Sequence, residues 1–212
     1  MKEKMEMRET GTTTVGIVCK DAVILASEGK STLGYLVSSK SAQKVYQIDD
    51  KIALTTAGGA GDTQALCRIL KAEINIYKTM RNTDFTVNAT ISLLSNILQQ
   101  NRYYPYMAML IVGGHDRDGF HVWTLDAMGG AEKDKSVATG SGSPFAYGVL
   151  EADYKENMTK EEGIRLVVKA IRSARERDIF SGGKIQVCVI TKDNLEFVDD
   201  TKIDEILKTF NK

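Results

Sequence analysis

The sequence predicts one α+β domain, built from two antiparallel β-sheets with helices packed on their outer faces. Two observations predict this class. The predicted strands come as hairpins joined by short turns, and the predicted helices come in pairs. This order differs from the strict strand–helix alternation of a doubly wound parallel sheet. The length of 212 residues is ordinary for a single domain with its own hydrophobic core.

The N-terminal part of the chain is predicted to form strands. Residues 12–18 are rich in β-branched side chains, and residues 22–26 are apolar, so they predict a hairpin around a Lys-Asp turn. A second hairpin is predicted to join residues 45–48 and 52–57 across an Asp-Asp-Lys turn. A Gly-Gly-Ala-Gly run then ends the strand, and Asp62 is predicted to cap the following helix.

Two helices are expected next. The first is predicted by apolar residues at mostly helical spacing, which are Leu66, Ile69, Leu70, Ile76, Tyr77 and Met80. The second has a cleaner apolar stripe, formed by Val87, Ile91, Leu94 and Leu98.

The middle of the chain returns to strands. Residues 106–112 and 120–125 are predicted to pair around a turn-rich segment, and residues 136–139 form a further short strand. His115 and His121 flank the turn, so we expect both to be exposed to solvent.

The C-terminal part is predicted to contain helices, strands and a last helix. Pro144 suits the first turn of a short helix that ends near Asp153. Thr159 and Glu162 form a predicted capping box at the start of a longer helix. The apolar stripe of that helix is Ile164, Val167, Val168, Ile171 and Ala174. Two strands and a helix follow, at residues 186–191, 195–198 and 202–210.

Composition excludes several classes of protein. Lys and Arg total 28 and Asp and Glu total 28, so the chain lacks the excess positive charge that nucleic acids and anionic membranes attract. No apolar run approaches the roughly 18–20 residues of a membrane span, and residues 1–11 lack the apolar segment of a secretory signal. Cys19, Cys67 and Cys188 are expected to be reduced core thiols of a cytoplasmic protein.

Common catalytic and binding motifs are missing from the sequence. It has no C-x-x-C, no H-E-x-x-H and no clustered histidine, so we expect no metal site. It also lacks a P-loop and a complete dinucleotide fingerprint, so we expect no cofactor. The Gly-Ser-Gly-Ser run at 140–143 does not match the nucleophile elbow of serine hydrolases.

A short polar leader, residues 1–11, ends in Gly11 directly before the β-rich segment that starts at Thr12. Such a pattern usually marks a frayed terminus that leads into an edge strand. The alternative is a processing site, at which cleavage between Gly11 and Thr12 frees Thr12 as an N-terminal nucleophile. A threonine hydroxyl needs an activating base, and the freed α-amine can serve as one.

An ordered set of motifs resembles the proteasome β subunits of archaeal type. These motifs lie at residues 11–18, 22–26, 44–49, 55–58, 61–62, 139–143 and 177–183. The resemblance implies the N-terminal-nucleophile hydrolase fold, a four-layer αββα sandwich of two antiparallel sheets flanked by helices. It also implies a threonine endopeptidase that degrades unfolded polypeptides inside an enclosed chamber. Residues 1–11 would then be a propeptide removed autocatalytically, and residues 12–212 a single peptidase domain.

The resemblance implies roles for individual residues. Thr12 would be the nucleophile, with Lys44 as the buried cation beside it. Glu28, where many members have Asp, would pair with Lys44 and hold it protonated. Gly58 would donate its backbone N–H to the oxyanion. The implied supporting network is Ser141, Asp178 and Ser181. The proton acceptor stays open between the Thr12 amine, Lys44 and a water.

The same resemblance implies a pocket for the residue before the cleaved bond. Its lining would be Ser31, Ala42, Thr56 and Ala60, which are all small and uncharged. A roomy neutral pocket favours apolar side chains over charged ones, because a charge buried there would lack a partner.

The partners implied by the resemblance are other copies and related subunits. The chain would form seven-membered β rings between rings of proteasome α subunits, and an ATP-driven unfoldase would act through the α ring. We expect no nucleic-acid or membrane partner. Two alternatives are a β subunit that only scaffolds the ring and a different N-terminal-nucleophile amidase. The intact Thr12, Lys44 and Gly58 argue against the first, and the Gly-Ser-Gly-Ser and Arg-Asp segments against the second.

Overall fold

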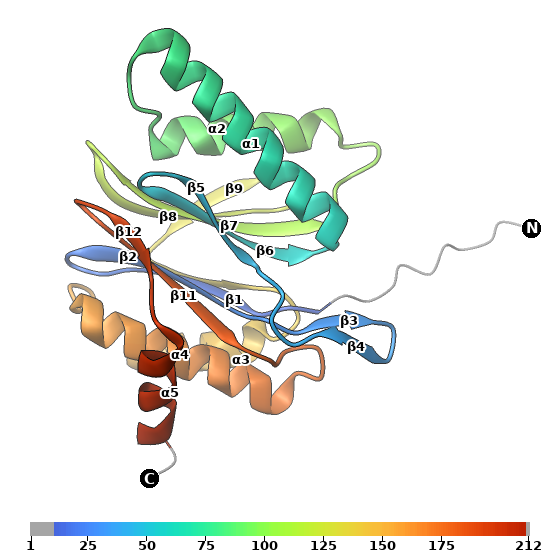
Figure 1. The fold of residues 1–212 in the computed structure, drawn as a ribbon, viewed down its shortest axis with the longest axis vertical. Coiled ribbons are helices and arrows are strands. Elements are labelled where there is room, and N and C mark those ends of the chain that lie inside the picture. Colours follow the sequence, from blue (N-terminus) through green and yellow to red (C-terminus); the bar gives the residue numbers. More distant parts are fainter. Residues whose placement is uncertain (1–10, 211–212) are drawn as a thin grey trace, which may run out of the picture.

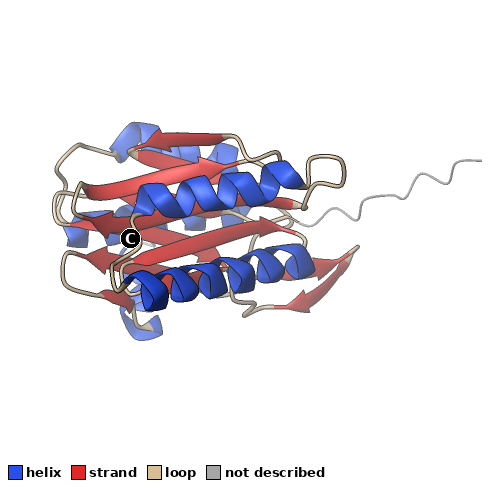
Figure 2. Cartoon of the chain, turned by 90° about the horizontal axis from the view of Figure 1, so that it is seen from above, coloured by secondary structure: helices blue, strands red, loops and turns tan. Residues whose placement is uncertain are grey.

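Two five-stranded sheets lie face to face between two layers of helices in the computed structural model, which describes residues 11–210 (Figures 1 and 2). Neighbouring strands in both sheets pair antiparallel. The predicted α+β sandwich is therefore confirmed. No helix among residues 11–210 has both the length and the apolar content that a membrane span requires.

The first sheet has the strand order β10-β1-β2-β11-β12. Its strands are β10 (Ser136–Thr139), β1 (Thr14–Val18), β2 (Ala22–Glu28), β11 (Ile185–Thr191) and β12 (Leu195–Phe197). The outer face of this sheet is covered by helices from the C-terminal half, as Figure 1 shows. These are α3 (Ser143–Asp153), α4 (Lys160–Arg177) and α5 (Asp200–Thr209).

The second sheet has the strand order β5-β6-β7-β8-β9. Its strands are β5 (Val45–Asp49), β6 (Ile52–Gly58), β7 (Ala108–Asp116), β8 (Gly119–Leu125) and β9 (Ala131–Asp134). The helices α1 (Ala60–Arg81) and α2 (Val87–Gln100) cover its outer face (Figure 1). A separate hairpin of β3 (Ser31–Leu33) and β4 (Leu36–Ser39) follows β2.

Three apolar clusters fill the three spaces between the four layers. Strand β2 contributes to two of these clusters. All seven of its residues are buried, and successive side chains point to opposite faces of the sheet. Ile24 packs with the α4 residues in one cluster, whereas Val23 and Leu25 pack with Ile111 of β7 in the cluster between the sheets. The remaining cluster joins the second sheet to α1 and α2.

Several local predictions are confirmed by the structure. Thr159 and Glu162 form the reciprocal capping box that starts α4, and the predicted α4 stripe is buried. Pro144 lies in the first turn of α3. The predicted stripe lies on α2 and is buried, and the three cysteines are buried without a disulfide, as expected.

The predictions for α1 are partly wrong. The helix begins at Ala60 after Gly59, and Asp62 does not cap it. The Asp62 carboxylate instead accepts a hydrogen bond from the backbone N–H of Met107, at 2.8 Å. Leu66 and Leu70, two of the apolar residues that predicted the helix, are buried.

The rest of the predicted α1 stripe faces outward. Its exposed members are Ile69, Ile76, Tyr77 and Met80, and Cys67 and Ile74 complete the buried face in their place. The apolar spacing was therefore read correctly as helical, but part of it marks a surface and not the core.

Other differences have equally local causes. The hairpin of β3 and β4 and the strand β9 were not predicted, because these strands have only 3 or 4 residues each and most of their side chains are exposed. The expectation that His115 and His121 are both exposed is wrong, because His115 is half-buried and His121 is buried. The His121 ring lies 3.1 Å from the carboxylate of Asp116.

Candidate active site

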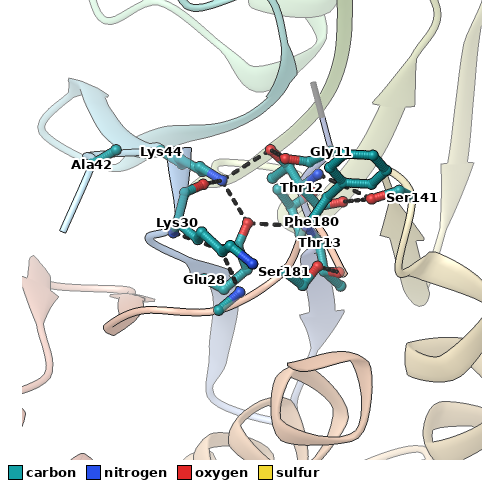
Figure 3. Close-up of polar contacts among 12 residues, drawn as sticks. Gly11, Thr12, Thr13, Glu28, Lys30, Ala42, Lys44, Ser141, Phe180 and Ser181 are labelled. Atoms are coloured by element: carbon teal, nitrogen blue, oxygen red, sulfur yellow. Dashed lines mark hydrogen bonds and ion pairs between the residues drawn. The ribbon is translucent and has the colours of Figure 1, made fainter. Parts of the chain in front are cut away.

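Thr12 lies at the edge of the sandwich, two residues before β1, and its side chain is buried among polar groups (Figure 3). Its hydroxyl donates a hydrogen bond to the carbonyl oxygen of Gly11, at 2.7 Å. The Nζ of Lys44 donates to the same hydroxyl oxygen, at 2.9 Å. The hydroxyl is thus held between a cation and the carbonyl of the peptide bond that precedes it.

Lys44 is fixed by three acceptors. Besides Thr12 Oγ1, its Nζ donates to the Glu28 carboxylate at 2.5 Å and to the Lys30 carbonyl at 2.6 Å. A lysine ammonium has three N–H donors, so these three acceptors match its full donor set. Lys44 stands just before β5 and Glu28 ends β2, so the two sheets each supply one partner.

Glu28 is fully enclosed, and its carboxylate is satisfied by several donors. One oxygen accepts from the backbone N–H of Lys30 at 2.6 Å and of Gly182 at 2.9 Å. The other accepts from Lys44 and, at 3.4 Å, from the N–H of Thr13. This set of donors explains how a carboxylate remains buried here, since an unpaired buried charge would be costly.

Lys44 and Glu28 form the expected pair, and two opposing influences act on the pKa of Lys44. Burial is the largest influence and lowers the pKa of Lys44 below its ordinary value. The negative charge of Glu28 and its hydrogen bond raise that pKa, as expected, but do not outweigh the burial.

Asp178 organises the other side of Thr12. It follows α4, and one oxygen of its carboxylate accepts from the hydroxyls of Ser141 and Ser181, each at 2.6 Å. Ser141 Oγ accepts the backbone N–H of Thr12 at 3.2 Å, and Ser181 Oγ lies 2.6 Å from the hydroxyl of Thr13. The structure therefore brings the predicted supporting residues together, with Ser141 at the nitrogen of Thr12 and Ser181 at the hydroxyl of Thr13.

Close backbone packing limits which residues fit around Thr12. The backbone of Gly140 has φ +90°, and a Cβ atom there would lie 1.9 Å from the carbonyl oxygen of Thr12. A Cβ atom on Gly11 would lie 2.0 Å from the Cβ of Phe180. Gly140 and Phe180 both lie inside the motifs at residues 139–143 and 177–183, but the sequence alone predicts no role for either.

Gly58 lies near Thr12, where β6 ends and the chain turns toward α1. Its φ is +130°, and a Cβ atom there would lie 2.0 Å from the carbonyl oxygen of Met107. Gly58 and Thr12 both line a cavity of about 630 Å³. A bound peptide carbonyl could therefore reach the hydroxyl of Thr12 and the backbone of Gly58 at once.

The four residues predicted to form the substrate pocket all line this same cavity. They are Ser31, Ala42, Thr56 and Ala60. The prediction of a neutral pocket is incomplete, however, because Arg68 and Lys71 of α1 and Lys30 also line it, and none of its described lining residues is acidic. The two α1 cations were not predicted, because no motif in the sequence indicates that Arg68 and Lys71 border the same cavity as Thr12.

A metal ion has no evident set of ligands in the described part of the chain. Among residues 11–210, no three His, Cys, Asp or Glu side chains lie close enough together to hold one. The groups around Thr12 are a hydroxyl, an ammonium, two carboxylates and backbone N–H donors. Such a set is suited to acyl transfer, with a hydroxyl as the nucleophile and fixed charges beside it.

Comparison with known proteins identifies the family of this chain. The proteasome subunit family matches residues 8–190. The proteasome subunit beta of Methanoregula boonei is 51% identical over 208 residues, covering 98% of each chain. Those of Methanosarcina thermophila and Methanocaldococcus fervens are each 50% identical, covering 91% and 93% of this chain and 92% and 89% of their own. The chain therefore belongs to the proteasome subunit family.

Proposed function

We propose that this chain is a catalytic β subunit of a proteasome core particle and acts as a threonine endopeptidase. The observation that carries the proposal is the position of the Thr12 hydroxyl, 2.9 Å from Lys44 Nζ and 2.7 Å from the carbonyl oxygen of Gly11. A protein that only scaffolds a ring has no need for this arrangement, nor for the buried ion pair behind it.

Maturation is the first reaction that this geometry supports. The Thr12 hydroxyl oxygen adds to the carbonyl carbon of Gly11, and the C–N bond between the two residues breaks. An ester forms on Thr12 while its nitrogen becomes a free amine. Water then hydrolyses the ester and releases residues 1–11 with a terminal carboxylate on Gly11. Residues 1–10 of this proposed propeptide lie outside the described part of the chain.

The same hydroxyl then attacks substrate peptide bonds. We assign the proton acceptor to the freed α-amine of Thr12, because all three donors of the Lys44 ammonium already have acceptors. Asp178 would hold that amine in place through Ser141, while Ser181 donates to the same carboxylate oxygen of Asp178. Lys44 would stabilise the developing alkoxide electrostatically, and Gly58 would donate its N–H to the oxyanion.

The partners of the chain follow from the same proposal. We propose that copies assemble into seven-membered rings stacked on rings of α subunits, and that an ATP-driven unfoldase supplies unfolded polypeptides. Exposed apolar side chains support assembly, since such patches mark interaction surfaces. They lie on α1 and on the hairpin of β3 and β4, and include Ile76, Met80, Leu33, Tyr35 and Leu36. The three buried, unpaired cysteines fit a reducing, cytoplasmic environment.

The proposal is tested by assembling the chain with its partner α subunits and measuring both the intact mass and peptide hydrolysis. The assembled chain should lose residues 1–11 and begin Thr-Thr-Thr-Val. Thr12→Ala should abolish processing and hydrolysis but still assemble, and Thr12→Ser should retain both reactions. Lys44→Ala should be nearly as damaging, because it also leaves Glu28 buried without its cation. Active particles that still begin at Met1 would overturn the proposal.

A further inference from the structure

A second cavity opens next to Thr12. It has a volume of about 880 Å³ and shares Gly11, Thr12 and Gly58 with the first cavity. Its other lining residues are Ala57, Pro105, Tyr106, Met107, Ala108, Met109, Ala127, Gly140, Ser141 and Phe180. None of these described lining residues carries a charge, whereas the first cavity is lined by four cations. The two spaces next to the nucleophile therefore differ in chemistry.

The second cavity is the open end of the space between the two sheets. Met109 of β7 pairs directly with Ala57 of β6. Because side chains alternate along a strand, Met109 lies on the same face as Ile111, which packs in the cluster between the sheets. Ile111 is fully buried, whereas Met109 is 49% exposed. The apolar layer between the sheets therefore opens into this second cavity next to Thr12.

The two cavities lie on opposite sides of Thr12. Figure 3 shows Ala42, Lys30 and Lys44 on one side of it and Phe180 and Ser141 on the other. When Thr12 attacks a substrate peptide, the reacting carbonyl has to lie at the Thr12 hydroxyl. One substrate residue then lies before the cleaved bond and one lies after it. If the first cavity holds the residue before the cleaved bond, the residue after it has to enter the second.

We infer that this second cavity binds the side chain of the residue after the cleaved bond, and that it selects large apolar side chains. The inference deepens the proposed function and depends on it. Met107, Met109 and Phe180 offer flexible and aromatic surface, which suits an apolar side chain of varied shape. A Lys or Glu side chain would lose water there without gaining a partner of opposite charge.

The place of this residue in the reaction is also defined. The Thr12 oxygen bonds to the carbonyl carbon, the C–N bond breaks, and the leaving nitrogen takes a proton to become an amine. The apolar side chain is attached to that leaving fragment. The second cavity therefore acts on acylation of Thr12, and it has to empty before water hydrolyses the ester.

The test uses assembled particles and internally quenched peptides that differ only in the residue after the cleaved bond. We expect kcat/KM to be about tenfold higher with Leu than with Ala, as the transfer of an apolar side chain from water predicts. Glu and Lys peptides should be cleaved more slowly than the Ala peptide. If no peptide is cleaved, the proposed function fails. If all are cleaved within twofold of one another, the proposed function stands and this inference fails.

A pair of charge variants identifies the cavity. Met109→Glu should favour Lys after the cleaved bond, and Met109→Lys should favour Glu, so the Lys-to-Glu ratio should differ about tenfold or more between the two variants. The ratio within one variant cancels losses from folding or assembly. Phe197→Glu and Phe197→Lys are matched controls, because Phe197 is exposed on β12 and lines neither cavity, and they should give equal ratios. Equal ratios in the Met109 pair would overturn the assignment.

Discussion

Lys44, just before β5, and Glu28, at the end of β2, form an ion pair with an N–O distance of 2.5 Å, and the carboxylate is fully buried. The pair lies directly behind the Thr12 hydroxyl, to which Lys44 also donates. Its two members have opposite influences on the charge of the lysine, because burial lowers the pKa of Lys44 and Glu28 raises it. The balance between them should decide the pH range of the reaction.

Glu28→Gln is therefore predicted to narrow the alkaline range of activity. If the ammonium form is required, activity falls as the pH rises through the pKa of Lys44, which lies below its ordinary 10.5. Removing the carboxylate lowers that pKa further, so the alkaline limb of the kcat/KM profile should move to lower pH. Glu151→Gln, at an exposed position on α3, is the control. An unmoved limb would show that the Lys44 charge does not control the rate.

Gly11→Ala is predicted to slow propeptide removal by about tenfold or more, which corresponds to about 1.4 kcal/mol in the barrier. The added Cβ would lie 2.0 Å from Phe180 Cβ and 2.5 Å from Ser141 Oγ, so the Gly11 carbonyl has to move away from the hydroxyl. Phe180→Gly in the same chain should restore part of the rate. The comparison is Gly148→Ala, whose Cβ meets no atom within 4 Å. The time course of the intact mass decides the outcome.

Peptides with large apolar residues before the cleaved bond are predicted to be cleaved best. Ala60→Phe and Thr56→Phe should narrow the first cavity, and should reduce cleavage after Tyr more than cleavage after Ala. Ala60 is exposed, so its variant should fold even if the Thr56 variant does not. Ala152→Phe on α3 serves as the control. If cleavage after Tyr and after Ala falls equally, these residues do not form the pocket.

The cations of the first cavity are predicted to determine whether peptides with Glu or with Arg before the cleaved bond are cleaved faster. Glu before the cleaved bond should be tolerated better than Arg, because Arg68, Lys71 and Lys30 line the cavity and none of its described lining residues is acidic. Replacing both Arg68 and Lys71 by Ala should reduce the Glu-to-Arg ratio about fivefold at low salt. The effect should shrink at high salt, because both side chains are exposed and screened. A ratio that is independent of salt and of these variants would exclude the electrostatic explanation.

Hydrolysis of small peptides is predicted to need neither metal nor nucleotide, and to resist thiol reagents. Burial raises the pKa values of Cys19, Cys67 and Cys188 to about 12, so their reactive thiolate forms should be scarce at neutral pH. Cys67 borders the first cavity, which makes it the stringent case. Activity should therefore survive chelators and iodoacetamide. Loss of cleavage in a chelator with recovery on adding zinc, or inactivation by alkylation, would contradict a threonine nucleophile.

Strong local patterns made much of the fold predictable from the sequence. The α4 helix has a capping box, a continuous apolar stripe and buried neighbours, and all three agree with one another. In α1, by contrast, Ile69 and Ile76 continue the helical spacing on the exposed side. Periodicity reports that an apolar face exists, but it does not report whether that face meets the core or a surface.

The site was predictable only as far as its motifs reached. Thr12, Lys44 and Asp178 were identified because they lie in segments that resemble a family, and the structure brings them together. The contact of Phe180 with Gly11 and the cations on α1 depend on how distant segments meet in space. No spacing along the chain predicts such a meeting, so these features required the structure.

The distribution of the site along the chain has a consequence for protein synthesis. Thr13 and Ser181, whose hydroxyls lie 2.6 Å apart, are separated by 168 positions in the sequence. A ribosome that adds about 5–20 residues per second needs roughly 8–34 s to cover that interval. Throughout that time the nascent chain carries Thr12, the proposed nucleophile, without Asp178 or Ser181 to position it. By this order of residues, the translating cell is not exposed to a working peptidase until almost the whole chain has been made.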